Sequence, residues 1–320
     1  MFGKLFNTND NQFNALAIAL MVLLMWHGTT TSAMSDDAKK ALTPPTPPLL
    51  LGQTGRDFEE SMKFGQIELS KGSFQTAADN FRAAVKFKGD SALAHLGLGN
   101  SLMGLGLNEE AQREIFGALQ LDSSLTTARF LWGSILMKKE SWDEAAGQFL
   151  QVLKVSPNDL ATRGNLGVCY EQKGQIDAAI EQFRYIIQTD PNNIDAHYNL
   201  AVAYDLKNEW KEGAAEYARV IKLNPKHSLA LVGLGNDLCN QQQFLQAIKI
   251  HQAEIKLHPD DYYAYIGLGR VYECMDKPKD ALTQYRKAIA IAPKAPECQR
   301  LVANMMKVRV KELGLQQLVH

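Results

Sequence analysis

Few residues of this sequence have types and spacings that could do chemistry. His251 and Glu254 lie one helical turn apart, a spacing that can place two metal ligands on one face of a helix. A histidine packed in a core would show the same spacing, and the place of His251 in the repeat described below favours packing. The sequence has no glycine-rich phosphate loop and no nucleophile elbow. We therefore predict no catalytic residue, no cofactor site and no metal site.

The cysteines are scattered and contain no C-x-x-C pair; they are Cys169, Cys239, Cys274 and Cys298. Cys239 and Cys274 fall on neighbouring predicted helices. The distance between packed helices exceeds the roughly 7 Å between Cα atoms that a disulfide allows. We predict free thiols and neither a zinc ribbon nor a redox pair.

Asparagines form a second group of interest: Asn100, Asn165, Asn199 and Asn236. A primary amide can donate to a peptide carbonyl and accept from a peptide N–H. Such side chains can hold an extended peptide without selecting its sequence. Amides that are simply solvated remain the alternative interpretation.

The overall charge narrows the class of ligand. The 320 residues contain 34 basic and 35 acidic side chains, for a net charge of −1. A nucleic-acid platform needs a basic face that displaces counterions from phosphates, so we expect no nucleic acid as partner. The apolar content of 46% also argues against a disordered chain.

The elements that must position these side chains follow from a repeat of 34 residues that begins at Phe58. Position 8 of the repeat is small throughout: Gly65, Gly99, Gly133, Gly167, Ala201, Gly235 and Gly269. Position 20 is also small: Ala77, Ala111, Ala145, Ala179, Gly213, Ala247 and Ala281. Apolar residues at positions 7, 11, 24, 27 and 28 have helical spacing, so each repeat predicts two helices that approach closely at the small residues. His251 occupies position 24.

Helix boundaries are marked by residues with known end preferences. Proline recurs at position 32, where it stops the second helix: Pro157, Pro191, Pro225, Pro259 and Pro293. Asp159, Asn193 and Asp261 are predicted N-caps, and Asp57 with Glu60 forms a possible capping box.

The small residues at positions 8 and 20 and the proline at position 32 resemble the tetratricopeptide repeat family. The resemblance implies an all-α, right-handed superhelical solenoid of antiparallel helix pairs. Its seven repeats cover residues 58–91, 92–125, 126–159, 160–193, 194–227, 228–261 and 262–295. Departures are Gly89 and Ser123 in place of proline, Glu68 and Glu254 at apolar positions, and Pro278 at the start of a second helix.

The resemblance also implies that the first helices line a concave groove through positions 2, 5, 6, 9, 12 and 13. This groove contains the candidate binding residues Met62, Leu96, Asn100, Phe130, Asn165, Tyr198, Asn199, Val232, Asn236, Ile266 and Arg270. An extended peptide or an amphipathic helix of another protein would fit an apolar groove with amides. Packing between neighbouring repeats is the alternative for the apolar members. The carboxylate clamp of chaperone-binding relatives is not predicted, because Leu96 precedes Asn100 and Thr127, Leu131 and Ala161 replace basic residues.

The ends of the chain carry separate expectations. Residues 15–26 are continuously apolar, so residues 1–33 are interpreted as a signal peptide or an uncleaved membrane anchor. Residues 34–57 are predicted to be a Pro-rich disordered linker, and residues 296–320 a C-terminal capping helix and tail. These features predict a secreted, periplasmic or membrane-anchored protein that faces away from the cytoplasm. Translation from Met34 would make it cytoplasmic.

Three functions remain open at this point. The first is a non-catalytic scaffold in the cell envelope that binds peptide segments of partner proteins in its groove. The second is an assembly subunit of a membrane-associated secretion, pilus or polysaccharide-export complex. The third is a regulatory or substrate-recruiting partner of a separate enzyme.

Overall fold

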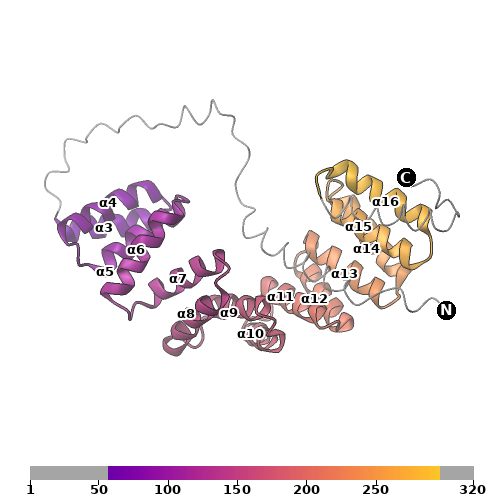
Figure 1. Cartoon of the computed structure of the whole chain (residues 1–320), viewed down its shortest axis with the longest axis horizontal. Helices are drawn as coiled ribbons and strands as arrows, with labels where there is room; N and C mark the ends of the chain where they lie inside the picture. The colour runs from indigo at the N-terminus through magenta and orange to yellow at the C-terminus, as the bar shows by residue number, and fades with distance from the viewer. Residues whose placement is uncertain (1–56, 296–320) are drawn as a thin grey trace, which may run out of the picture. The chain divides into compact units, whose positions relative to one another are not determined.

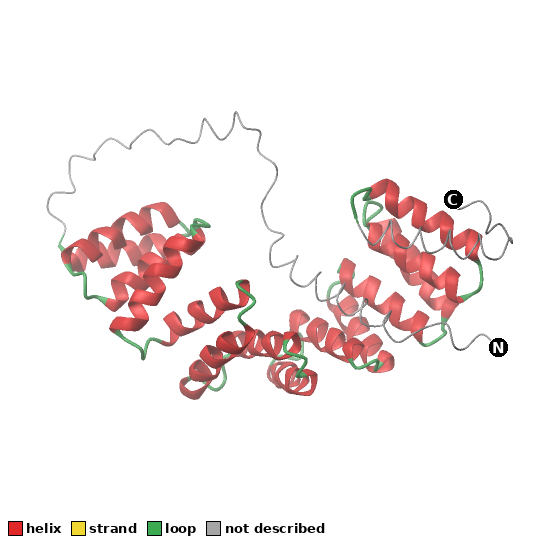
Figure 2. Ribbon diagram, in the orientation of Figure 1, coloured by secondary structure: helices red, strands yellow, loops and turns green. Residues whose placement is uncertain are grey.

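The structure is a computed structural model that describes residues 57–295. Within this range all regular elements are α-helices, and they follow one another as antiparallel pairs (Figures 1 and 2). The first helices are α3 (Phe58–Ser70), α5 (Ala92–Gly104), α7 (Thr126–Lys138), α9 (Leu160–Gln172), α11 (Ile194–Leu206), α13 (Ser228–Asn240) and α15 (Tyr262–Cys274). The second helices are α4 (Phe74–Phe87), α6 (Asn108–Leu121), α8 (Trp142–Val155), α10 (Ile176–Thr189), α12 (Trp210–Leu223), α14 (Phe244–Leu257) and α16 (Pro278–Ile291). The predicted all-α array of helix pairs is confirmed.

The described residues divide into two compact halves, residues 57–182 and residues 183–295, and the boundary falls within α10. We call them the N-terminal half and the C-terminal half. The predicted leader, linker and capping helix lie outside the described residues. No helix between residues 57 and 295 is long and apolar enough to cross a membrane.

Side-chain caps begin several first helices as the sequence predicted. Asp57 accepts a hydrogen bond from the backbone N–H of Glu60 at 2.9 Å. Asp159, Asn193 and Asp261 cap α9, α11 and α15 in the same way. Pro278 is the first residue of α16, where a missing N–H removes no helical hydrogen bond.

The turn inside each pair contains a feature that sequence reasoning missed. Position 15 has a positive φ in all seven repeats, between 56° and 75°. Glycine, which adopts this conformation without a steric penalty, is present three times, as Gly72, Gly106 and Gly174. Other residue types hold the same conformation in the remaining repeats: Glu140, Asn208, Gln242 and Asp276. The turn is therefore set by the helix pair and not by glycine alone.

The side chain at position 24 forms the core of each pair. Phe81 is 1% exposed and its ring lies against Gly65 of its own repeat, where an added Cβ would be 2.9 Å from the ring. The same ring lies against Gly97, at position 6 of the next repeat. Tyr217 packs on Gly233, and His251 packs on Gly235 and Gly267. Small residues thus allow close approach within a pair, as predicted, and also between successive pairs.

Candidate functional site

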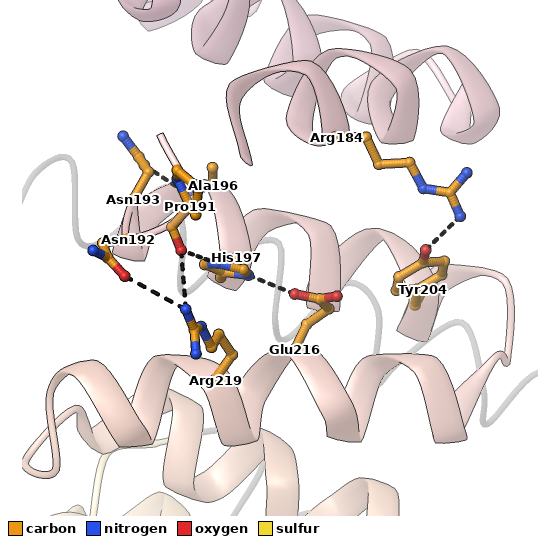
Figure 3. Close-up of polar contacts among 9 residues, drawn as sticks. All are labelled: Arg184, Pro191, Asn192, Asn193, Ala196, His197, Tyr204, Glu216 and Arg219. Carbon is orange, nitrogen blue, oxygen red and sulfur yellow. Dashed lines mark hydrogen bonds and ion pairs between the residues drawn. The ribbon is translucent and has the colours of Figure 1, made fainter. Parts of the chain in front are cut away.

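A recurrent polar contact, which we call the position-4 latch, fixes the first helix of most repeats. His197 of α11 contacts the carbonyl oxygen of Pro191 through Nε2 at 3.1 Å and Glu216 of α12 through Nδ1 at 2.6 Å (Figure 3). Arg163 donates to the Pro157 carbonyl and to Gln182 in the same way, at 2.8–3.0 Å. His95 and Arg129 make the equivalent contacts, and Tyr265 makes the contact to the preceding turn. The latch joins the turn before a repeat to both helices of that repeat.

Two side-chain combinations build this latch, histidine with glutamate and arginine with glutamine. We expect the double change His197→Arg and Glu216→Gln to keep the stability of the chain, because it recreates the pair of the fourth repeat. His197→Leu alone should lower the unfolding free energy by about 1–3 kcal/mol, since it removes the imidazole from Glu216 and leaves the Pro191 carbonyl only the 3.5 Å contact from Arg219. Urea denaturation of the three proteins compares them. Equal stability of His197→Leu and the unchanged chain would show that the latch contributes nothing.

Several predicted groove residues are instead buried by packing. Met62, Tyr198 and Val232 are 8%, 6% and 6% exposed. The Tyr198 ring lies 5.8 Å from that of Tyr217 and 5.2 Å from that of His227. Packing within the helix array buries these three side chains, and the ring contacts of Tyr198 are made within its own repeat.

The other apolar candidates are half-buried. Phe130 lies with its ring 5.9 Å from that of Phe149, and Ile266 packs against the buried cluster around Tyr285. Leu96 is also half-buried, whereas Leu93 on the same helix is 56% exposed. These side chains keep part of their apolar surface open to solvent.

The candidate amides are placed differently from the apolar residues. Asn100, Asn165, Asn199 and Asn236 are all half-buried, and none of their side-chain amides makes a hydrogen bond to another residue between 57 and 295. Other asparagines in the same range use their side chains in hydrogen bonds within the protein. Asn80 donates to the Thr76 carbonyl, and Asn193 caps α11. The four candidate amides therefore have donors and acceptors available for a ligand.

These amides belong to different halves of the structure. Asn100 and Asn165 lie in the N-terminal half, on α5 and α9. Asn199, Asn236 and the half-buried Arg270 lie in the C-terminal half, on α11, α13 and α15. In this second group, α13 packs against both α11 and α15, so successive first helices bring these three residues to neighbouring positions.

His251 is a core residue, as its position in the repeat predicted. It is 0% exposed, and both ring nitrogens lack a hydrogen-bond partner. Burial lowers the pKa of His251 to about 3, with a further contribution from Arg270. Glu254 is also fully buried. Among residues 57–295, no three or more metal-ligating side chains gather at one point.

The three cysteines within the described range are free thiols, as predicted. Sequence reasoning missed that two of them interact: the Cys239 thiol, with a smaller contribution from Arg270, lowers the pKa of Cys274 to about 7. Cys169 is buried, and burial raises its pKa to about 12. Cys298 lies outside the described residues.

A hollow of about 460 Å³ lies at the turn between α7 and α8, beside the end of α9. It is lined by Glu140, Ser141, Trp142, Asp143, Glu144, Gln172 and Lys173. Two of the lining residues form an ion pair, in which Nζ of Lys173 lies 2.6 Å from Oδ1 of Asp143. None of the predicted groove residues contributes to this hollow.

Comparison with protein families and with curated proteins agrees with the repeat. Models of the family described as Tetratricopeptide repeat match residues 62–123, 130–194, 172–234 and 227–294. DnaJ homolog subfamily C member 3 of Homo sapiens is 29% identical over 103 residues, which are 32% of this chain and 20% of that protein. The same protein of Bos taurus is 28% identical over 103 residues, with the same coverage of 32% and 20%. The chain thus spans about a fifth of the length of the curated relatives it matches.

Solved structures show the same fold. A tetratricopeptide repeat protein from Parabacteroides merdae matches with a TM-score of 0.59 and 16% identity, over 79% of this chain and 100% of that one. YrrB, described as a TPR protein with an unusual peptide-binding site, matches with a TM-score of 0.52 and 22% identity, over 59% of this chain and 97% of that one. Together with the helix pairs, the small residues at positions 8 and 20 and the family match along most of residues 57–295, these similarities show that the chain belongs to the tetratricopeptide repeat family.

Proposed function

We propose that this protein is a non-catalytic scaffold that binds extended segments of partner proteins on the faces of its first helices. The observation that carries the proposal is the set of half-buried amides at positions 6 and 9 that make no hydrogen bond within residues 57–295. A half-buried amide loses part of its hydration and gains most from a partner that supplies both a donor and an acceptor. A peptide backbone is such a partner. The family supports the general role, and the peptide-binding site of YrrB supports the kind of ligand.

The C-terminal half offers the more complete set of contacts. Asn199, Asn236 and Arg270 lie on three successive first helices, and α13 contacts the other two. Packed helices lie roughly 8–10 Å apart, and an extended peptide rises about 3.3 Å per residue, so one side chain would contact about every third peptide residue. Arg270, which also interacts with other residues of this half, places a positive charge beside the two amides. This spacing favours an extended segment over a docked helix.

The test uses the full chain and a displayed library of random peptides. We expect enriched peptides to bind roughly 10- to 100-fold more weakly to the variant with Asn199→Ala and Asn236→Ala, because each lost amide interaction costs about 1 kcal/mol. Gln252→Ala is the matched control, since it removes an exposed amide from the second helix α14. Unchanged affinity of the double variant, measured by calorimetry, would refute the role of the amides. Binding lost equally in the control would refute the choice of face.

We further propose that the scaffold acts in the cell envelope. The support is the apolar run at residues 15–26 followed by the proline-rich segment at residues 43–48. The mass of the mature N-terminus tests this location. Cleavage near Ala33 or retention of the apolar run in a membrane fraction is the expected result, whereas a soluble protein that starts at Met34 would contradict it.

A further inference from the structure

Two aspartates meet inside the C-terminal half, and the scaffold role does not use them. Asp205 is at position 12 of α11 and Asp237 is at position 10 of α13. They are 7% and 1% exposed. The helices α11, α12 and α13 contact one another, so both carboxyl groups lie inside one three-helix layer.

The two carboxyl groups converge on the backbone of Gly213 in α12. A Cβ added to Gly213 would lie 2.6 Å from Oδ1 of Asp205 and 2.7 Å from Oδ2 of Asp237. Position 20 is alanine in the other six repeats, so the missing methyl group coincides with the site of the acid pair. Position 10 is apolar or small in the other six repeats, and Asp237 is the exception. Two departures from the repeat thus meet at one point.

The hydrogen bonds around the two carboxyl groups leave one oxygen of each without a donor, so a single proton could lie between them. The Tyr217 hydroxyl donates to Oδ2 of Asp205 at 2.8 Å. Oδ1 of Asp205 and Oδ2 of Asp237 are the two buried oxygens of this pair that have no donor if both groups are ionised. Both oxygens lie within 2.7 Å of the Cβ position of Gly213, and an interaction between the two carboxyl groups contributes to the pKa of each. A proton on one oxygen would give the other a donor.

We propose that Asp205 and Asp237 share one proton that holds α11 and α13 together across Gly213, and that loss of this proton drives the helices apart. The pair then acts as a pH-sensitive element in the solenoid. It is stable when protonated and self-repelling when both groups are ionised.

Among residues 57–295, no positively charged side chain contributes to the pKa of either carboxyl group. Within the described C-terminal half, the titratable groups that act on the two carboxyls are each other and Tyr217. Burial and Asp205 raise the pKa of Tyr217, which keeps it neutral, and Tyr198 of α11 packs on its ring. His251 of α14 faces Gly235 of α13 and is neutral because its pKa is about 3. Arg184 of α10 donates a hydrogen bond to the Tyr204 hydroxyl at 2.7 Å (Figure 3). Arg270 of α15 contributes to the lowered pKa of His251.

The raised pKa values of the two aspartates determine how the stability of the folded state changes with pH. Burial raises the pKa of Asp205 to about 7, and burial together with the charge of Asp205 raises the pKa of Asp237 to about 10. In the unfolded chain both groups have a pKa of about 4. The folded state therefore binds more protons above pH 4, and its stability falls as the pH rises from 4 through 7 toward 10. Each proton retained only by the folded state changes the unfolding equilibrium by about tenfold per pH unit.

The same helices contain candidate ligand contacts. Asn236 directly precedes Asp237, and Asn199 lies on the helix of Asp205. Separation of α11 from α13 would change the distance between these amides. This consequence rests on the proposed function, whereas the proton itself is tested without any ligand.

The test compares full-length chains by urea denaturation and by hydrogen exchange of α11 and α13 between pH 7 and 9. Asp237→Asn keeps the shape and supplies an N–H to Asp205 at every pH. We expect the unchanged chain to lose about tenfold in its folding equilibrium per pH unit and the variant to lose much less. Glu212→Gln, which removes an exposed carboxylate from α12, is the matched control and should follow the unchanged chain. Equal slopes in the unchanged chain and in Asp237→Asn would overturn the proposal.

Two further measurements keep the test decisive if Asp237→Asn does not fold. Infrared spectroscopy of the unchanged chain should show a protonated carboxyl at pH 7 that disappears at higher pH, and its absence at pH 7 would contradict a shared proton. Addition of calcium or of a chelator at pH 8 should leave the denaturation midpoint unchanged. A rise with calcium would show that the pair binds a cation and not a proton.

Discussion

Phe81→Ala should lower the free energy of unfolding by about 3–5 kcal/mol, the usual cost of removing a fully buried phenylalanine side chain. The ring is 1% exposed and fills the space between Gly65 of its own repeat and Gly97 of the next. Glycine cannot move a side chain into the cavity that alanine would leave. Relaxation around the cavity is therefore limited, which places the cost in the upper part of the range.

Phe87→Ala is the matched control for this change. Phe87 lies on the same helix, α4, but is 60% exposed, so its replacement should change stability by no more than about 0.5 kcal/mol. Chemical denaturation followed by circular dichroism gives both values. Because a solenoid is stabilised by contacts between neighbouring repeats, hydrogen exchange in α3–α5 should rise more than in α14–α16. Similar losses for the two variants would contradict the packing described for position 24.

His251→Phe should stabilise the chain, and the gain should grow as the pH falls. The unchanged imidazole is fully buried with both nitrogens unpartnered, which costs about 1–3 kcal/mol per unsatisfied group. Phe81 occupies the equivalent space between Gly65 and Gly97, so a phenyl ring fits between Gly235 and Gly267. At neutral pH we expect a gain of about 1–3 kcal/mol.

The pH dependence of this variant follows from the lowered pKa. His251 has a pKa of about 3 in the folded state and about 6.5 when unfolded, so its contribution is present above 6.5 and is lost as the pH falls toward 3. At pH 5 the loss is about 2 kcal/mol, and His251→Phe should remove it. Urea midpoints at pH 7.5 and pH 5 measure both effects. Equal pH dependence with and without His251 would refute the buried neutral imidazole.

The repeat and its helices could be predicted from the sequence because they depend on local patterns. Small residues at positions 8 and 20, caps such as Asp159 and prolines such as Pro191 act within one repeat. The small residues recur in all seven repeats and the proline in five, which separates the pattern from chance. The core role of His251 followed from the same pattern, since position 24 is occupied by a large side chain in every other repeat.

The candidate site could be predicted only in part, because the burial of a side chain depends on contacts with residues distant from it in the sequence. Asn199 and Tyr198 are adjacent in sequence and were both assigned to the groove, yet the Tyr198 ring is buried against Tyr217 and His227. Gly97, Gly233 and Gly267 at position 6 were a visible signal of packing between repeats, although three occurrences in seven did not reveal it. The meeting of Asp205 and Asp237 is marked in the sequence only by two departures from the repeat, Gly213 at position 20 and Asp237 at position 10, and these lie in different repeats.

The position-4 latch also determines where the chain can be cut. His197 binds a carbonyl that precedes its own repeat and a carboxylate that follows within it, so residues 194–227 lack one of the two partners. A segment from Pro191 to Asn224 has the same length and includes Pro191, His197 and Glu216 together. Modules that are to be deleted, duplicated or exchanged between proteins should therefore begin at position 32 and not at position 1. Natural insertion or loss of repeats in this chain would be best tolerated at the same joints.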